Sequence, residues 1–450
     1  MIISETIQKG LVQTYRLSLL LPSLILIFAA TLASAEKSAQ APKFAATLSS
    51  AEKSAQALKI DKLQQLGLQA NGLVRAARSQ IDIAEANVVS ASAFLNPKVT
   101  VMAGDQNARL DSQVTGPSGT VREILVSQPI ENPFLRSARI GSAEALVDAR
   151  EANLDQVRAD LAAQLRVRAY EMILRQEQAQ METSIYDLMK EIQRRIKVSV
   201  DVGETARFEL IRADTEVLGA ENRMEAARLN AERARVALIQ LTAGALQSGF
   251  EIDASLSDPV EFPPLETLQK EIALINPDIQ RLEAEQNSAD RRISQEKASV
   301  LPSLNILFSN FQDKQFTSNA AGVNVEIPLF YRRRGQIDNA IYDSARIRDT
   351  LEYRRFEISQ LLESAWQALK IAKRRVEMFE GGIVTEAELA LSIAQTAYRL
   401  GERGFMEVLD TQRVLRGVLA DLLQARFELQ SAAAEIDRLR ANYPEEQPIE

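Results

Sequence analysis

The fold is decided by Ser142–Val202, SAEALVDAREANLDQVRADLAAQLRVRAYEMILRQEQAQMETSIYDLMKEIQRRIKVSVDV, which contains neither Gly nor Pro. The stretch is rich in Ala, Leu, Glu, Arg and Gln, residue types with strong helix propensity. As one helix, its 61 residues would extend about 90 Å, whereas a typical helix has only about 11 to 12 residues. We therefore expect a helix that is too long for a compact globular domain.

A second long helix is expected from Gln336 to Leu400, and only Gly381-Gly382 interrupts it. We interpret the two glycines as a kink or a local unwinding. Each long helix ends beside a glycine, Gly203 or Gly401, which predicts a tight turn. The return helices are expected over residues 206–243 and 405–442. Ahead of the first long helix, three- and four-residue apolar spacing predicts one amphipathic helix from Leu63 to Phe94.

The chain contains this arrangement of long helix, tight turn and return helix twice. Asn71 recurs 205 positions later as Asn276, and Gly203 recurs 198 positions later as Gly401. The difference between the two offsets falls between Pro97 and Gly203, in the segment that contains a strand turn, where length changes at little cost. A duplicated unit of this size predicts a pseudo-symmetric molecule built from two similar halves.

Each half also contains two short runs in which the apolar period falls to two. Such alternation gives a strand one apolar face and one polar face. This pattern fits either a half-exposed soluble sheet or a membrane barrel with lipid outside and water inside. The expected strands cover about 98–105 and 121–128 in the first half, and about 303–311 and 321–328 in the second.

The organisation follows from these elements. Lys9 and Arg16 precede an apolar run that ends in the small-residue site Ala33-Ser34-Ala35, which predicts a secretory signal peptide. Asp258-Pro259 and Pro263-Pro264 separate the two halves. We expect a signal peptide at 1–35, a flexible linker at 36–60, a first repeat at 61–245, an inter-repeat linker at 246–264, a second repeat at 265–442 and a tail at 443–450.

Composition excludes several function classes. A net charge of −8 argues against a nucleic-acid partner, because phosphate binding needs a basic surface. The sequence has no Cys and no His, which removes disulfides, thiolate metal sites, a lipidated cysteine and the commonest general base. No triad, metal-ligand or phosphate-loop spacing is present. We therefore expect no enzymatic activity, no bound cofactor and no bound metal.

Four strands are too few to close a barrel, and an open sheet edge in lipid would leave backbone groups unsatisfied at a cost of several kcal/mol each. Several copies of the chain must therefore close it together. Two copies would supply eight strands and three copies twelve. If each copy also donates its long helices to a cylinder, the assembly is a membrane barrel on a helical tube.

The chain resembles the TolC-type outer-membrane efflux proteins, and within them the branch serving heavy-metal and related resistance-nodulation-division (RND) exporters. The likeness covers about Leu63 to Leu439 and rests on five motifs in order. They are Asn96-Pro97, SQPIENPFLRSARIGSAEAL at 127–146, LPSL at 301–304, EIPLFYRRRGQIDNA at 326–340 and YRLGERGFMEVLDTQ at 398–412. The chain departs from many relatives in lacking a lipid-anchor cysteine.

The resemblance implies a mainly α fold with a small β portion, in which duplicated α-hairpins and two β-hairpins form a homotrimer. A twelve-strand outer-membrane barrel would stand on a twelve-helix periplasmic tunnel, exported by the signal peptide, in contact with outer-membrane lipid and not lipidated. The implied function is an exit duct that docks on a periplasmic adaptor and an inner-membrane RND pump. A channel of a type I protein secretion or drug-export system is an alternative, and a periplasmic adaptor or a structural coiled coil fits the pattern less well.

The resemblance also implies a gate at the turns beside Gly203 and Gly401. Tyr398 and Arg403 would latch onto Glu209 of a neighbouring hairpin, and Glu407 with Asp410 would ring the aperture. Glu407 and Asp410 are three residues apart, hence on one helix face. The alternative is that these acids only oppose the helix dipole and face solvent.

Two further features have a structural and a functional interpretation. Arg332, Arg333 and Arg334 follow the last strand and form either a basic collar at the barrel junction or a solvated run of charge. Trp366 lies on a long helix, where we expect packing rather than ligand binding. The sequence does not specify the transported substrate; heavy-metal cations or small toxic compounds are suggested by the family branch alone.

Overall fold

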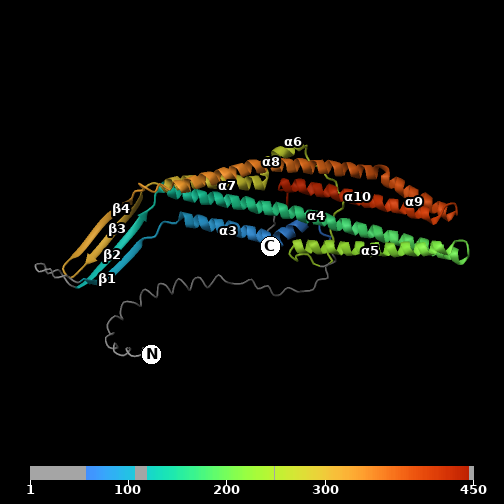
Figure 1. Ribbon diagram of the computed structural model, residues 1–450, viewed down its shortest axis with the longest axis horizontal. Helices are drawn as coiled ribbons and strands as arrows, with labels where there is room; N and C mark the ends of the chain where they lie inside the picture. The colour runs from blue at the N-terminus through green and yellow to red at the C-terminus, as the bar shows by residue number, and fades with distance from the viewer. Residues whose placement is uncertain (1–56, 107–118, 248, 445–450) are drawn as a thin grey trace, which may run out of the picture. The chain divides into compact units, whose positions relative to one another are not determined.

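The computed structural model describes residues 57–106, 119–247 and 249–444, which form long helices and one four-stranded sheet (Figure 1). The mainly α fold with a small β portion is the one expected from the sequence. The predicted signal peptide, most of the linker at 36–60 and most of the tail at 443–450 lie outside the described residues, as does the greater part of the turn at 116–119.

The first long helix, α4, runs from Pro133 to Asp201 and contains 69 residues. It begins before the stretch free of Gly and Pro because Asn132 caps it, accepting a 2.9 Å hydrogen bond from Phe134 N, and Pro133 occupies its first turn. Gly141 is accommodated inside the helix. The expected start at Ser142 was therefore nine residues late.

The second long helix is divided as the paired glycines predicted. It consists of α8, Arg334–Met378, a π-helical turn η1, Phe379–Ile383, and α9, Val384–Arg399. The π turn contains Gly381 and Gly382 and is held to α10 by Arg426, whose Nη2 donates to Glu380 Oε1 at 2.8 Å. Gly382 has φ 164° and ψ −33°, values outside the helical range, so the interruption is the expected kink between α8 and α9.

The return helices are α5, Arg207–Leu241, and α10, Phe405–Leu439. Gly203 has φ 82° and Gly401 has φ 72°. This left-handed conformation is open to glycine without the steric cost that a Cβ atom brings, which accounts for a glycine at both turns.

The helices before the strands differ from the expectation of one helix over Leu63–Phe94. The structure has α2, Ile60–Ala70, and α3, Gly72–Ser92, with the break at Asn71. The second repeat has the same break at Asn276, between α6, Leu265–Ile275, and α7, Pro277–Ala298. The apolar period continues across the break, so periodicity alone did not reveal it.

The asparagine at each break serves two helix ends. Asn71 Oδ1 accepts from Leu73 N at 2.8 Å, and Asn276 Oδ1 accepts from Asp278 N at 3.1 Å. Each side-chain amide also donates a 2.9 Å bond, from Asn71 to Leu241 O and from Asn276 to Leu439 O. These carbonyls belong to the last residues of α5 and α10, where helices leave carbonyl groups unpaired.

The helix contacts give a definite order. The short helix α3 and the return helix α5 both pack on α4, while α7 and α10 pack on both α4 and α8 (Figure 1). The second long helix α8 packs on α7 and α10 of its own repeat. Each repeat therefore places one long helix beside two shorter ones, and α4 joins the repeats.

The strands form one antiparallel sheet in the order β1-β2-β3-β4. Both expected hairpins are present, and β2 pairs with β3 to join them. In the register, Val99 lies opposite Val126, which lies opposite Phe308, so apolar side chains from neighbouring strands share one face. The strands are β1, Lys98–Gln106, β2, Gly119–Ile130, β3, Ser303–Gln312, and β4, Thr317–Glu326.

The paired asparagines give a first prediction. Asn276→Ala removes a helix cap and leaves the buried carbonyl of Leu439 unpaired, so we expect it to lower the free energy of unfolding by about 2 kcal/mol. Asn71→Ala is expected to cost less, because Asn71 is partly exposed whereas Asn276 is 4% exposed. Asn222→Ala, at an exposed position of α5, is the control.

Thermal or denaturant unfolding in one detergent would measure all three variants. An Asn276→Ala protein as stable as the Asn222→Ala control would contradict the double role of this side chain.

Candidate functional site at the hairpin tips

The two hairpin turns lie together at one cavity of about 630 Å³. Residues of both turns line it, including Glu204 and Thr205 from the first and Gly401 and Gly404 from the second. The cavity also brings Glu209 beside Tyr398 and Arg403, which lie in the other hairpin, far from Glu209 in the sequence. The three residues assigned to the latch by resemblance therefore share one space within a single chain.

Tyr398 is fixed by packing on α10. Its ring centroid lies 6.3 Å from that of Phe405, which is 2% exposed and begins α10. Burial raises the pKa of the Tyr398 hydroxyl, and the nearby carboxylate of Glu209 raises it further, while Arg195 partly opposes this. Tyr398 thus keeps its proton at neutral pH and can donate a hydrogen bond to a carboxylate.

Arg403 lies in the turn before α10, and the acids Glu407 and Asp410 follow on α10 itself. Arg403 Nη1 lies 3.4 Å from Glu407 Oε2, and Arg413 Nη1 lies 3.8 Å from Asp410 Oδ1. The side chains of Arg403 and Asp410 remain 63% and 68% exposed. Ion pairs this exposed contribute little stability, so the geometry leaves both acids and Arg403 available to other partners.

A buried ion cluster below the tip was missed by the sequence analysis. Glu182 on α4 has a side chain that is only 7% exposed. Arg416 Nε on α10 lies 2.7 Å from Glu182 Oε1, and Arg223 Nε on α5 lies 3.7 Å from Glu182 Oε2. One carboxylate therefore ties both return helices to the long helix.

A signal for this cluster exists in the sequence. The buried apolar positions of α4 near the tip follow three- and four-residue steps, and Glu182 continues the same series toward the N-terminus. They are Ile185, Met189, Ile192 and Ile196. A carboxylate on an apolar stripe indicates a buried charge with a partner, although the partner helices cannot be read from one helix.

The three arginines after the last strand have different surroundings. Arg333 starts α8 with φ 50°, and its Nη2 donates to Glu296 Oε2 of α7 at 2.8 Å. Arg334 is 93% exposed and lies 3.7 Å from Asp338, and Arg332 is also exposed. Arg333 thus contributes to the fold, while Arg332 and Arg334 face away from it. Trp366 packs against the core between α6, α8 and α10.

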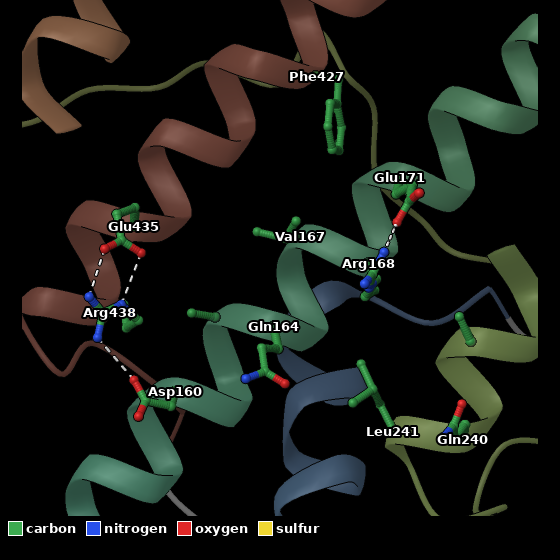
Figure 2. A pocket seen from close by; sticks show the side chains of 12 residues that line it. Asp160, Gln164, Val167, Arg168, Glu171, Gln240, Leu241, Phe427, Glu435 and Arg438 are labelled. Atoms are coloured by element: carbon green, nitrogen blue, oxygen red, sulfur yellow. Dashed lines mark hydrogen bonds and ion pairs between the residues drawn. The ribbon is translucent and has the colours of Figure 1, made fainter. Parts of the chain in front are cut away.

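A cavity of about 830 Å³ lies between α4, α5 and α10 (Figure 2). Arg438 lies at its edge and is bonded to Asp160 of α4 at 3.0 Å and to Glu435 at 2.7 Å. Arg438, Asp160 and Glu435 are thus paired with one another across α4 and α10, which suits a structural junction between the repeats.

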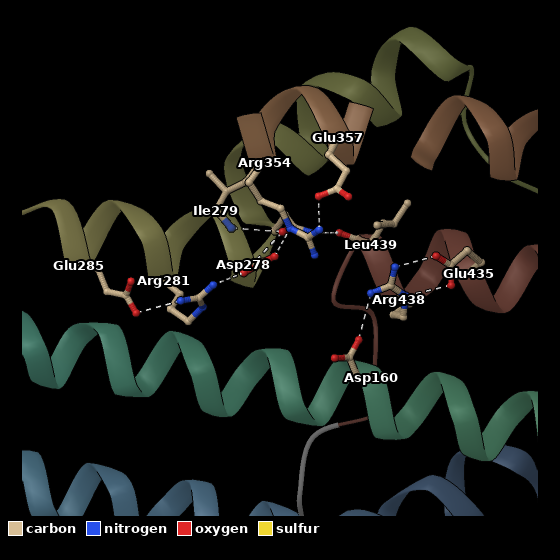
Figure 3. Close-up of polar contacts among 11 residues, drawn as sticks. Asp160, Asp278, Ile279, Arg281, Glu285, Arg354, Glu357, Glu435, Arg438 and Leu439 are labelled. Carbon is tan, nitrogen blue, oxygen red and sulfur yellow. Dashed lines mark hydrogen bonds and ion pairs between the residues drawn. The ribbon is translucent and has the colours of Figure 1, made fainter. Parts of the chain in front are cut away.

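Figure 3 shows a second ion cluster beside this junction. Asp278 of α7 contacts Arg354 of α8 and lies 2.6 Å from Arg281. Burial alone would raise the pKa of Asp278, but its hydrogen bonds to Arg281 and Arg354 outweigh burial and lower it. The carboxylate therefore stays ionised and links α7 to α8.

The described residues contain no group of three or more His, Cys, Asp or Glu side chains placed to hold a metal ion within one chain. No helix in the same residues is both long enough and apolar enough to span a bilayer.

Comparison with known proteins gives consistent matches. The family model for outer membrane efflux protein matches residues 63–244 and 268–442. The cobalt-zinc-cadmium resistance protein CzcC of Cupriavidus metallidurans is 24% identical over 384 residues, covering 85% of this chain and 90% of CzcC. The outer membrane efflux protein BepC of Brucella suis is 24% identical over 371 residues, covering 80% of each chain.

Solved structures show the same fold. A crystal structure of CusC, described in terms of folding and transmembrane channel formation, matches with a TM-score of 0.73. It is 16% identical and covers 85% of this chain and 91% of CusC. At this identity the likeness extends to the arrangement of helices and strands.

The buried cluster gives a second prediction. Glu182→Gln removes the charge that Arg416 and Arg223 share, and we expect it to lower the free energy of unfolding by about 2 kcal/mol. Adding Arg416→Leu is expected to recover part of this loss, because one unpaired charge is removed. The matched control is Glu216→Gln, which disrupts the contact of Glu216 with the 54% exposed Arg413.

The control is expected to cost less than about 1 kcal/mol, as exposed pairs do. If the effects of Glu182→Gln and Arg416→Leu were additive in a double-mutant cycle, the coupling between these two residues would be excluded.

Proposed function

Since this chain belongs to the outer membrane efflux protein family, we propose that it is the passive exit duct of a tripartite RND-type exporter. In this proposal three copies form one duct, the inner-membrane pump supplies the energy, and a periplasmic adaptor joins the two. The duct performs no catalysis and needs no cofactor. The observation that carries the proposal is that the family match spans both repeats, with the long helices and the sheet at their expected places.

The helix order supports assembly from several copies. Within the described residues, α4 has short helices of both repeats beside it, whereas α8 has only those of its own repeat. Pseudo-symmetry therefore leaves α8 of one copy free to accept α3 and α5 of the next. A contact of this head-to-tail kind closes into a ring when the rotation that relates neighbouring copies is a whole fraction of a turn, as it is for three copies.

The surfaces that would meet are suitably apolar. Leu218 and Leu229 on α5 are 65% and 68% exposed, and Tyr353 and Phe356 on α8 are 64% and 62% exposed. Exposed apolar side chains on both α5 and α8 would be buried if α8 of one copy packed against α5 of the next, which favours this contact.

The sheet supports the same assembly. Its edge strands β1 and β4 run antiparallel to their neighbours, so β4 of one copy can pair with β1 of the next in an antiparallel ladder. Three copies would give twelve strands and remove every open edge. The exposed apolar face, which includes Val101 and Val323, would then contact lipid. Arg332 and Arg334 would meet lipid phosphate at the barrel junction.

We propose that the tip is the gate of the duct. Arg403 lies in the turn before α10, where a positive charge opposes the helix dipole and favours a specific anionic partner. In the closed state Tyr398 and Arg403 hold Glu209 of an adjacent hairpin. Glu407 and Asp410 from three copies would then surround one opening, where six carboxylates attract cations.

The proposed cargo is heavy-metal cations. Support comes from the name of the relative CzcC, which specifies cobalt, zinc and cadmium resistance, and from the acids placed at the tip. The absence of His and Cys from the full sequence suits transit rather than tight capture. The name of BepC states efflux without a substrate, which keeps drug export or type I protein secretion as the second candidate.

The duct itself can be tested directly. The mature protein, extracted in detergent from outer-envelope membranes, is expected to be a trimer that conducts ions when inserted into planar lipid bilayers. A monomer that stays in solution without detergent and inserts into no bilayer would overturn the proposal.

The latch gives a separate prediction. Tyr398→Phe combined with Arg403→Ser removes the hydroxyl and the charge that hold Glu209, so we expect single-channel conductance to rise severalfold. Arg348→Ser, which removes a charge of similar exposure (60%, against 63% for Arg403) from α8, is the control and should leave conductance unchanged. Equal conductance of the latch variant and the unaltered protein would refute the latch while leaving the duct intact.

The acidic ring predicts cation block. Replacing Glu407 and Asp410 with Ala removes six carboxylates from a trimer, so divalent cations added from the tip side should block current at least about tenfold less effectively, which corresponds to about 1.4 kcal/mol of binding. Titration of the current with Co²⁺ or Cd²⁺ measures this. If divalent cations blocked the double-Ala variant as effectively as the unaltered protein, the proposed acidic ring would be wrong and both acids would face open solvent.

A further inference from the structure

We infer that the seam between α4 and the α9–α10 hairpin is a binding site for a small uncharged molecule with an apolar body and one hydrogen-bond acceptor. The seam encloses a cavity of about 270 Å³, a volume suited to a molecule of one-ring size. Its walls come from three helices and are mainly apolar: Met181, Ile185 and Leu188 from α4, Leu391 from α9, and Leu415 and Leu419 from α10.

One polar group in this wall lacks a partner. Gln412 lines the cavity and is only 5% exposed. Among the described residues, its Nε2 atom has no hydrogen-bond partner although it is buried. A buried N–H donor without an acceptor is costly, and a ligand oxygen placed in the cavity would remove that cost. Gln412 also ends the tip motif quoted from the sequence, whose function the gate does not explain.

The charges around the cavity select an uncharged ligand. Arg416 lines the wall, but its Nε donates to Glu182 Oε1 at 2.7 Å. Arg223 approaches the other oxygen of Glu182 at 3.7 Å. Because the one cation in the wall is neutralised by a buried carboxylate, an anionic ligand would gain little there and a cationic one would meet Arg416. Small amides, ketones and phenols are uncharged and carry an oxygen that can accept a hydrogen bond from Gln412.

A ligand bound in this cavity would affect the position of the α9–α10 hairpin. Leu391 lies on one arm of the α9–α10 hairpin and Gln412 on the other, and both contribute to the wall that faces α4. A ligand would therefore act as a wedge that sets the separation of this hairpin from α4. The site itself depends only on the fold and would exist whether or not the chain is a duct.

The sequence provides a clean reporter because it contains no cysteine. Ser184 is an exposed lining residue at the rim, so Ser184→Cys introduces the only thiol at the mouth of the cavity. Acetophenone is the probe, and ethylbenzene has nearly the same shape without the acceptor. Ser392→Cys, exposed on α9 and not a lining residue, is the control.

We expect acetophenone at twice its Kd to slow alkylation of Ser184→Cys by iodoacetamide about threefold, as simple occupancy requires. Alkylation of Ser392→Cys should not change. Ethylbenzene should protect less well than acetophenone at the same concentration. In Ser184→Cys with Gln412→Leu, this order should reverse, since the donor has been replaced by an apolar side chain.

Each probe partitions into detergent to the same extent with either protein, so the change in its protection between Ser184→Cys and Ser184→Cys with Gln412→Leu does not depend on that partition. Three results would overturn the inference: no protection of Ser184→Cys by either probe up to its solubility, equal slowing at both cysteines, or an unchanged preference for acetophenone in the Gln412→Leu background. Helix content by circular dichroism confirms that each variant is folded before the comparison.

Discussion

Each repeat depends on one asparagine side chain that serves two helix ends at once. The side-chain oxygen of Asn276 accepts from the first turn of α7, and its amide nitrogen donates to the last carbonyl of α10. Asn71 does the same for α3 and α5. Each asparagine thereby holds the start of a short helix against the end of the return helix of the same repeat. This contact fixes where the two helices lie beside the long helices. Two groups that would be unpaired become partners of a single amide.

The long helices and the alternating strands could be predicted because each is a local property of the sequence. Composition without Gly or Pro specified α4, and paired glycines specified the interruption at Phe379–Ile383. The break at Asn71 was missed because apolar periodicity continues across it, although Asn71 and Asn276 are N-caps and Pro277 opens α7. Its bond to the end of α5, 170 positions away, is tertiary and could not be predicted. The pairing of β2 with β3 is also tertiary and joins the two repeats.

The residues of the candidate site were also predictable only in part. Resemblance identified Tyr398, Arg403 and Glu209, and the fold brings them to one cavity. Glu182 and Gln412 escaped notice because a single polar residue in a long helix has many possible roles until the helices beside it are known. Arg403 lies near Glu407 in one chain, so the same guanidinium has one carboxylate on the helix that follows it and another, Glu209, in the proposed latch. Two partners for one cation provide a physical basis for two arrangements of the tip.

The break at Phe379–Ile383 also sets the direction of everything beyond it. Gly382 has φ 164° and ψ −33°, values outside the helical range, so α8 and α9 meet at a kink. The chain from Val384 to Arg399 is helical, so a change at the kink would swing the whole of α9 and carry Tyr398 away from Phe405. A bend of a few residues thus aims a helical arm whose far end holds the residues proposed for the gate.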